Sequence, residues 1–364
     1  MIKRLMGICG FWLRCLTGIV RTCRTQRWGG WLVLALLAGC STSRNSSPIA
    51  PLWSDYKSRY VLSEGRVVDS GNNHVSHSEG QGYAMLLAIA NNDRRCFDRL
   101  WQWTQQHLQV RDDRLFAWHW QAARPHINDH NNAADGDLLI AWALLRAGQT
   151  WQDAGLLSQS SQILRDIRQK LVRPSAIGPV LLPGAYGFET SAESLLLNPS
   201  YWVYPALRDI ADYEPAEPVW RQLQHSGLQL LQVWQQAGYR LPPDWIVLNP
   251  HTGSVSIDAS KPARFGFEAV RVPLYLCWID QCQNAVLDGV AEVWQQPDPP
   301  AWLEADQSQY ADFVLSAGGK SVRDLLQSQR GGAALSLPST LPKESDYYSS
   351  SLLILAQLAV QKSE

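Results

Sequence analysis

Apolar residues recur with the spacing of an α-helix along most of this chain. The segments that carry this period are 82–92, 96–108, 136–148, 154–172, 205–214, 219–238, 269–280, 287–296 and 347–361. Alternation typical of strands is nearly confined to residues 60–70 and 245–257. From these two periods we predict an all-α protein with a few short strands in its loops.

Loops rich in Gly, Pro and Asn join these helices in pairs, and no long linker divides the chain. Pairs of mid-length helices joined in this way favour a closed ring of helical hairpins. Periodicity alone leaves another helical array open as an alternative.

The first 39 residues have the pattern of an export signal. Several basic residues precede an apolar run at 31–40, which is too short to span a membrane comfortably. The end of this run, "LAGC" at 37–40, resembles the bacterial lipobox, in which the cysteine is acylated. We therefore expect a lipoprotein-type signal peptide over 1–39, with ordinary signal cleavage near this point as the alternative.

A lipobox implies that Cys40 carries lipid and becomes the first residue of the mature chain. The polar stretch that follows suits a flexible tether, which we place at residues 40–50. Ser41 stands where Asp would favour retention in the inner membrane, so we expect the outer membrane. The predicted location is the periplasm, with the lipid as the only membrane anchor.

Residues 51–364 are predicted to form a single catalytic domain. The whole chain has 46% hydrophobic residues and a formal net charge of −1, which is ample for one large core. The sequence has no basic run and no strongly positive balance, so a nucleic acid is not an expected partner.

Three cysteines remain in the predicted domain: Cys96, Cys277 and Cys282. Their spacing is not that of a zinc site. Cys277 and Cys282 are too far apart for a bridge if both lie on one helix. We predict buried thiols, with a disulfide as the alternative.

Tryptophan is unusually frequent, with 17 residues in a chain of 364. At least half are expected to be structural, because a buried indole needs a partner for its N–H. Others, including Trp118, Trp202 and Trp245, lie near loops that contain Tyr, Asn, Asp or His. Flat aromatic faces beside carboxylates are typical of a polysaccharide cleft.

Several acidic residues lie where helices are predicted to begin. Locally, Asp135 is a plausible N-cap and Asp137 a favourable charge in the first helical turn. Glu79 follows Ser78, which has the makings of a capping box with Gln81. Capping does not explain why several helices begin in this way while the adjoining loops carry Trp, Asn and His.

The chain resembles glycoside hydrolase family 8. The stretch "AADGDLLIAWALLRAGQTW" (133–151) is similar to the family signature, and "SEGQGYAMLLA" (78–88) to the segment of the catalytic acid. Further similar segments, in order along the chain, are 198–207, 242–246, 265–278 and 347–356. The resemblance implies an (α/α)6 barrel that hydrolyses β-1,4-glucan with inversion, with no metal or other cofactor.

Within this family the resemblance is to periplasmic endoglucanases associated with bacterial cellulose synthase. It therefore implies a link to cellulose biosynthesis, with cellulose chains as the substrate and the synthase machinery as a potential partner. Two residues depart from the family pattern: Ala134 stands in place of Ser or Thr, and Glu268 in place of the Asp that is the usual general base.

The resemblance also implies catalytic roles. Glu79 is expected to be the general acid and Glu268 the general base, with Asp135 positioning the sugar or acting as an alternative base. Tyr201 is expected to orient the water or the base. Arg271 either holds Glu268 ionised or forms an ordinary ion pair on the helix surface. The residues expected to bind substrate are Trp118, Trp202, Asp137 and Trp245.

Three functions follow from these residues. The first is a β-1,4-glucanase of the cell envelope. The second keeps the fold and changes the substrate to chitosan or xylan. The third is a glycan-binding lipoprotein without catalysis, a reading supported by Glu268 in place of Asp. Reducing-sugar release from cellulose derivatives, chitosan and xylan distinguishes the three.

Overall fold

The computed structural model describes residues 47–331, 335 and 337–361. They lie in a compact unit that spans Ser46–Glu364. Cys40, the predicted signal peptide and most of the predicted tether fall outside the described residues.

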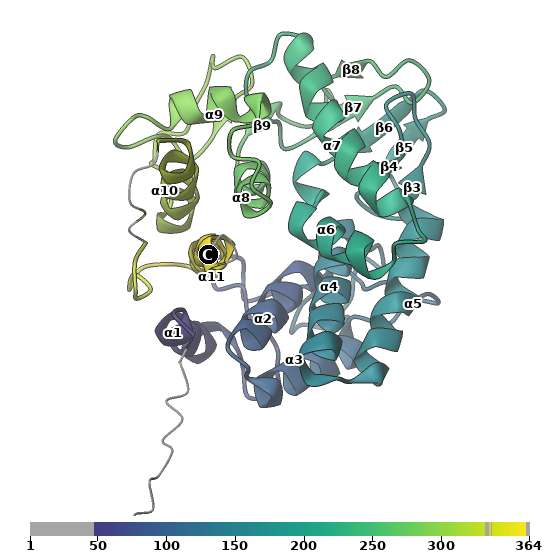
Figure 1. Cartoon of the computed structure of the whole chain (residues 1–364), viewed down its shortest axis with the longest axis vertical. Helices are drawn as coiled ribbons and strands as arrows, with labels where there is room; N and C mark the ends of the chain where they lie inside the picture. Colours follow the sequence, from purple (N-terminus) through teal and green to yellow (C-terminus); the bar gives the residue numbers. More distant parts are fainter. Residues whose placement is uncertain (1–46, 332–334, 336, 362–364) are drawn as a thin grey trace, which may run out of the picture. The chain divides into compact units, whose positions relative to one another are not determined.

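The described residues form eleven α-helices, which Figure 1 shows arranged as a ring. They are α1 (Ala50–Tyr60), α2 (Ser78–Ala90), α3 (Arg94–His107), α4 (Ala134–Trp151), α5 (Ala154–Leu171), α6 (Tyr204–Tyr213), α7 (Val219–Gln236), α8 (Arg271–Trp278), α9 (Asp288–Val293), α10 (Ala317–Gly331) and α11 (Tyr347–Gln361).

An inner ring is made by α2, α4, α6, α8 and α11, each of which contacts the next. Gly80 of α2 completes the ring, because a Cβ there would lie 2.5 Å from the Tyr347 hydroxyl of α11. Most residues of α2, α4, α8 and α11 are buried. Helices that are apolar on all sides belong in an interior, which explains their position.

The outer helices pack against the inner ones as hairpin partners. Contacts join α3 to α2, α5 to α4, α7 to α6 and α10 to α11. In α3, α5 and α7, buried residues recur at helical spacing and most of the remaining positions are polar. This one-sided burial is typical of helices that cover a core. The predicted all-α barrel of helical hairpins, with an inner ring covered by outer helices, is therefore confirmed.

Short strands occupy the loops of the barrel. The largest sheet has the antiparallel order β5-β6-β7-β8, and three two-stranded pairs are β1-β2, β3-β4 and β9-β10. Their bounds are β1 (Ser76–His77), β2 (His119–Trp120), β3 (Val172–Arg173), β4 (Val180–Leu181), β5 (Glu189–Ser191), β6 (Ser194–Leu197), β7 (Ile246–Leu248), β8 (Val255–Ser256), β9 (Arg264–Phe265) and β10 (Leu303–Glu304). Two short 3-10 helices, η1 (Pro199–Tyr201) and η2 (Ala285–Leu287), complete the elements.

The prediction of free thiols at Cys277 and Cys282 is wrong, because these residues form a disulfide. Helix α8 ends at Trp278, and Asp280 adopts a left-handed conformation with φ 63°. The chain therefore turns back, and the two Cα atoms lie 4.4 Å apart. The sequence argument failed because it extended the helix through both cysteines.

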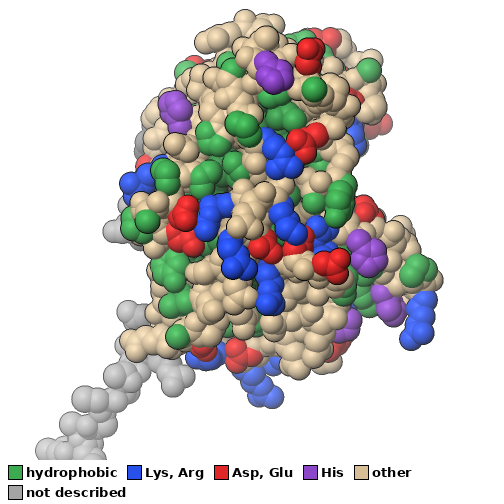
Figure 2. All heavy atoms as spheres, turned by 90° about the vertical axis from the view of Figure 1, so that its right-hand side faces the viewer, with side chains coloured by type: hydrophobic (Ala, Val, Ile, Leu, Met, Phe, Trp, Pro, Cys, Tyr) green, Lys and Arg blue, Asp and Glu red, His purple; other side chains and the backbone are tan. Residues whose placement is uncertain are grey.

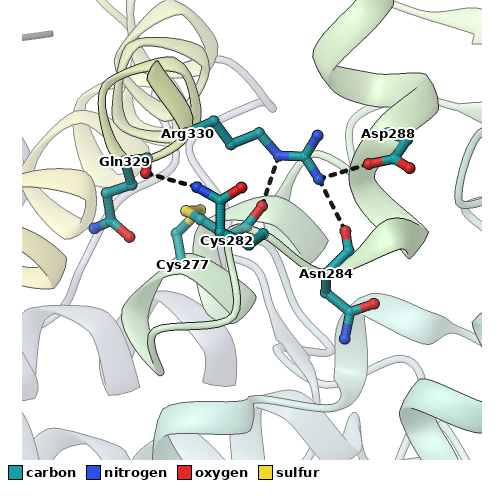
Figure 3. Close-up of a disulfide and its surroundings, with 7 residues drawn as sticks. Cys277, Cys282, Asn284, Asp288, Gln329 and Arg330 are labelled. Carbon is teal, nitrogen blue, oxygen red and sulfur yellow. Dashed lines mark hydrogen bonds and ion pairs between the residues drawn. A yellow bond between two sulfur atoms is a disulfide. The ribbon is translucent and has the colours of Figure 1, made fainter. Parts of the chain in front are cut away.

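A side chain from α10 holds the turn that contains Cys282 (Figure 3). The Arg330 guanidinium donates to the carbonyl oxygens of Cys282, at 2.6 Å, and Asn284, at 2.9 Å, and it pairs with Asp288 at 2.9 Å. The disulfide and Arg330 together fix the end of α8.

None of the described helices is long and apolar enough to cross a membrane. Figure 2 shows one face of the molecule, on which acidic and basic side chains lie interspersed rather than in separate fields.

Candidate active site

The N-terminal ends of the inner helices meet at a cleft of about 490 Å³. Glu79 is the second residue of α2, Asp135 the second of α4 and Arg271 the first of α8. The complete lining is Asp69, Gly71, Asn72, His77, Ser78, Glu79, Trp118, Ala133, Asp135, Tyr201, Phe267, Glu268, Arg271, Asp346, Tyr347 and Tyr348. The barrel therefore gathers residues from distant parts of the sequence at one end.

The absence of a side chain at Gly136 brings Glu79 and Asp135 together. A Cβ at this position would lie 2.1 Å from the Ser78 hydroxyl oxygen and 2.9 Å from the Glu79 nitrogen. The first turns of α2 and α4 thus touch through backbone, and no larger residue fits between them. This close contact is the structural reason for glycine between the two aspartates of α4.

The capping roles predicted for these residues are wrong. Ala133 is the N-cap of α4 and makes no side-chain cap bond, and Asp135 lies inside the helix. The Ser78 hydroxyl is buried without a hydrogen-bond partner among the described residues. Gln81 turns away from the helix terminus and accepts from the Val67 N–H at 2.7 Å. Capping therefore does not account for Glu79 or Asp135.

Arg271 lies between the carboxylates and is almost completely buried. One terminal nitrogen of its guanidinium donates to Glu79 and, at 2.8 Å, to Asp135. The other donates to Glu268 and, at 2.8 Å, to the Ser200 hydroxyl. Arg271 is therefore no surface ion pair, which was one of its two predicted roles.

Burial dominates the protonation of the two inner carboxyls. It raises the pKa of Glu79, although Arg271 acts in the opposite direction and Glu268 adds to the increase. It raises the pKa of Asp135 to about 7, where Arg271 again opposes it and Glu79 again adds to it. Two neighbouring buried carboxyls of this kind favour retention of a proton, which a general acid requires.

Glu268 is the most accessible of the three carboxylates. Its side chain is 35% exposed, compared with 20% for Glu79 and 2% for Asp135. Besides Arg271, it accepts from the Asn198 side-chain amide at 3.3 Å. An accessible carboxylate held by an arginine can remove a proton from a water molecule in the cleft.

Tyr201 lies in η1, under the Arg271 guanidinium, whose carbon is 5.6 Å from the ring centroid. Burial raises the pKa of Tyr201 well above its usual value. Its hydroxyl therefore stays protonated and can donate a hydrogen bond in the cleft.

Trp118 forms part of the cleft wall, as predicted for a residue that binds substrate. The β1-β2 pair places it beside α2, with its carbonyl oxygen accepting from the Ser78 N–H at 3.1 Å. Its indole N–H donates to Asp129 at 2.9 Å, and its ring lies parallel to His77, 6.1 Å away between centroids. The residue remains 36% exposed, and its ring can stack on a sugar.

Two residues predicted to bind substrate do not reach the cleft. Trp202 is fully buried, and its N–H donates to the Leu223 carbonyl oxygen at 3.0 Å. Asp137 is also fully buried: it accepts from the Phe116 N–H at 2.9 Å and from Asn132 at 2.6 Å. Both predictions are wrong, because these side chains point into the packed core below the helix ends.

Trp245 contacts a residue of the cleft wall but does not line the cleft itself. It stacks on Phe188 with centroids 6.0 Å apart and is 6.2 Å from Tyr201, which lines the cleft. It is not among the residues that line the cleft around Glu79. Its contact with substrate stays a prediction.

Several residues of the cleft were not identified from sequence. Tyr347 and Tyr348 begin α11, and the Tyr347 hydroxyl is buried with no hydrogen-bond partner among the described residues. Asp69 and Asp346 add two acidic side chains to the cleft. Paired tyrosines at the start of an apolar helix are a usable signal, whereas the two aspartates lie in loops without a distinctive pattern.

Among the residues that the structure describes, no cluster of three or more His, Cys, Asp or Glu side chains has the arrangement of a metal site.

Comparison with known proteins places this chain in a family. The profile of glycosyl hydrolases family 8 matches residues 24–362. An endoglucanase of Cellulomonas uda is 40% identical over 278 residues, which are 75% of this chain and 76% of that protein. A probable endoglucanase of Novacetimonas hansenii is 36% identical over 315 residues, which are 85% and 90% of the two chains.

The solved structures agree with this assignment. The family 8 endoglucanase Cel10 from Klebsiella pneumoniae superposes with a TM-score of 0.79 at 40% identity, covering 86% of this chain and 99% of that one. The profile match extends over nearly the whole sequence, and the solved structure shares the arrangement of its helices. This chain is therefore a member of glycosyl hydrolases family 8.

Proposed function

We propose that this protein is an inverting endo-β-1,4-glucanase, with Glu79 as general acid and Glu268 as general base. The proposal rests on two carboxylates, Glu79 and Glu268, which line the same cleft and accept hydrogen bonds from different terminal nitrogens of Arg271. The relatives named above are endoglucanases, and inversion is the mechanism known for this family.

Inversion needs a protonated carboxyl at the glycosidic oxygen and an ionised one that activates water on the other face of the sugar. Glu79 is buried and its pKa is raised, so it donates the proton. Glu268 is more exposed and takes the proton of the attacking water. Bond cleavage and water attack on opposite faces give a product of inverted anomeric configuration.

Arg271 supports both steps. Its hydrogen bond to Glu268 holds the carboxylate that acts as base. After proton transfer, Glu79 is itself a buried carboxylate, and the same guanidinium stabilises this charge. Asp135 grips the sugar at the bond being cut, and Tyr201 orients the water or the base.

Substitution of the two glutamates tests these roles. Glu79→Gln and Glu268→Gln should each lower kcat on a soluble cellulose derivative by about 10²–10⁴, the usual contribution of a positioned acid or base. Glu268→Asp should keep part of the activity, because it restores the residue common in the family. Affinity for cello-oligosaccharides serves as the control and should survive all three changes.

The opposite results would reassign the roles. Activity in Glu268→Gln together with none in Asp135→Asn would transfer the base to Asp135. Full activity in Glu79→Gln, Glu268→Gln and Asp135→Asn would refute the proposed site. Optical rotation of the initial product distinguishes inversion from retention.

A second substrate is favoured by the acidity of the cleft. Asp69 and Asp346 line it in addition to the three catalytic-site carboxylates, and protonated amino groups of chitosan pair with such side chains. Reducing-sugar release from cellulose derivatives, chitosan and xylan should be compared for the same enzyme preparation. Loss of chitosan activity alone in Asp69→Asn/Asp346→Asn would support this second substrate, and no activity on chitosan would exclude it.

We further propose that the protein is an envelope lipoprotein that trims nascent cellulose beside its synthase. The predicted export signal and the resemblance of residues 37–40 to a lipobox support export and anchoring. The Cys277–Cys282 disulfide supports an oxidising compartment such as the periplasm. Cys40→Ser should abolish lipid labelling; a Cys40→Ser protein that is labelled and fractionates like the original would refute the anchor.

The link to cellulose synthesis has its own test. A strain without this protein should make cellulose of altered amount or chain length. The original gene should restore it, and the Glu79→Gln form should not. Restoration by Glu79→Gln would show that hydrolysis is not the required activity.

A further inference from the structure

Asp244 is a buried carboxylate with no role in the mechanism above. It lies just before β7, in the segment "PPDWI" (242–246), and is only 8% exposed. Its own N–H donates to the Arg264 carbonyl oxygen at 2.7 Å, which attaches it to β9. The chain continues from β9 directly into the turn that carries Glu268.

One oxygen of Asp244 accepts three backbone N–H groups of that turn. The donors are Gly266 at 3.1 Å, Glu268 at 3.1 Å and Ala269 at 2.7 Å. The turn leads into α8, and the Arg271 N–H at the start of this helix donates to the Glu268 carbonyl oxygen at 3.1 Å. The first N–H groups of a helix have no partner within it. Asp244 therefore caps this turn from a different part of the chain.

The absence of a side chain at Gly266 leaves room for the Asp244 carboxylate. A Cβ on Gly266 would lie 2.6 Å from the second carboxylate oxygen of Asp244. Any side chain at position 266 would push the carboxylate or the turn away. The fit of Gly266 against Asp244 is a second observation, independent of the hydrogen bonds, that the two are matched.

The contacts act directly on the backbone of the general base. The Glu268 side chain takes its direction from this backbone, because the N–H groups of Glu268 and Ala269 both donate to Asp244. Burial raises the pKa of Asp244 to about 7, and the three N–H donors act in the opposite direction because they favour the ionised carboxylate. Fixing the main chain also compensates for the additional methylene of Glu268, which otherwise gives its carboxylate more freedom than an aspartate has.

We propose that Asp244 is a positioning residue that holds the Gly266–Ala269 turn so that the Glu268 carboxylate faces the cleft. This inference rests on the proposed function, in which Glu268 is the general base. Asp244 itself does not touch the substrate, so its effect must pass through Glu268.

Two substitutions at Asp244 form a matched pair. Asp244→Ala removes the acceptor, and kcat should fall about 100-fold, the usual effect of displacing a reacting group by 1 Å. KM should change little, because the cleft wall is otherwise intact. Asp244→Asn keeps an oxygen in the same place and should retain most of the activity. An Asp244→Ala enzyme with kcat within threefold of the original would overturn the proposal.

Combination with Glu268→Gln separates positioning from a general effect on folding. If Asp244 acts only through the base, Asp244→Ala/Glu268→Gln should be no slower than Glu268→Gln alone. If the two losses multiply, Asp244 has another role and the proposal is wrong. If Glu268→Gln alone is fully active, the proposed function fails instead, and the two failures are thus distinguishable.

Gly266→Ala provides a route that leaves Asp244 in place. Its added methyl group should displace the carboxylate, lower kcat with little change in KM, and likewise have no further effect in the Glu268→Gln background. This variant also decides the question if Asp244→Ala does not fold, and undiminished kcat in Gly266→Ala would count against the proposal.

Discussion

Reduction of the Cys277–Cys282 disulfide should lower thermal stability by a small, calculable amount. The two cysteines are separated by 5 positions in sequence. For a loop this short, the chain-entropy relation gives about 2 kcal/mol of stabilisation at 25 °C. Domains gain roughly 2.1 cal/mol/K of entropy per residue on unfolding, so a unit that spans Ser46–Glu364 gains about 0.65 kcal/mol/K. The ratio predicts a decrease in Tm of about 3 °C.

The assay compares protein refolded with and without reductant, with the thiols counted to verify reduction. Both cysteines are buried, so unfolding is needed to reduce them completely. Cys277→Ala/Cys282→Ala is the control, and its Tm should not respond to reductant. A shift below about 1 °C, or one above 8 °C, would refute the reasoning from loop length.

Catalysis should respond less than stability. Arg271 and Cys277 lie at opposite ends of α8, about 9 Å apart along the helix axis. Arg271 is also held by its carboxylates, independently of the disulfide. At 25 °C the reduced enzyme should therefore keep its kcat, and a large decrease would show that the end of α8 controls the position of Arg271.

Three further predictions follow from burial. Trp118→Ala should weaken the binding free energy of cello-oligosaccharides by roughly 1–3 kcal/mol, by analogy with stacking on bases, and equal affinity in this variant would exclude stacking. Trp202→Ala should instead lower the free energy of unfolding by about 3–5 kcal/mol. Burial raises the pKa of Asp137 to about 8, so the carboxyl stays protonated in the folded protein at pH values where it is ionised in the unfolded chain. The free energy of unfolding should therefore decrease as pH rises from about 4 to 8, by at most about 1.4 kcal/mol per pH unit. Chemical denaturation across this range should show that slope, and Asp137→Leu should reduce it. Gly136→Ala should abolish soluble expression or activity, because its Cβ would lie 2.1 Å from the Ser78 hydroxyl oxygen, and a stable, fully active variant would contradict the close packing.

Nine helices were predicted from sequence close to their observed positions, because long apolar periods survive in any packing. Two were missed for a physical reason: α1 and α10 have many polar residues and bury only part of their surface. Their helical state depends on contacts with α11, α8 and α9 that a local pattern does not contain. The strand prediction at 245–257 is confirmed by β7 and β8, whereas 60–70 makes only isolated bridges.

Some residues of the candidate site were predicted correctly from sequence and others were not. Glu79, Asp135 and Arg271 came from the family resemblance, and the structure brings them together with Glu268. Trp202 shows what sequence reasoning lacks: it sits in a polar stretch, yet its indole points beneath the helix ends, where a core carbonyl group accepts its N–H. Local composition gives the neighbours along the chain, and burial depends on neighbours in space.

The acidity of the cleft has a consequence for how the enzyme responds to ionic strength. Five acidic side chains and one arginine line it, so a polyanionic substrate such as carboxymethyl cellulose meets net repulsion on approach. The Debye length falls from about 30 Å at 0.01 M salt to about 10 Å at 0.1 M. KM for carboxymethyl cellulose should therefore decrease as salt is added over this range, while KM for the uncharged hydroxyethyl cellulose stays constant.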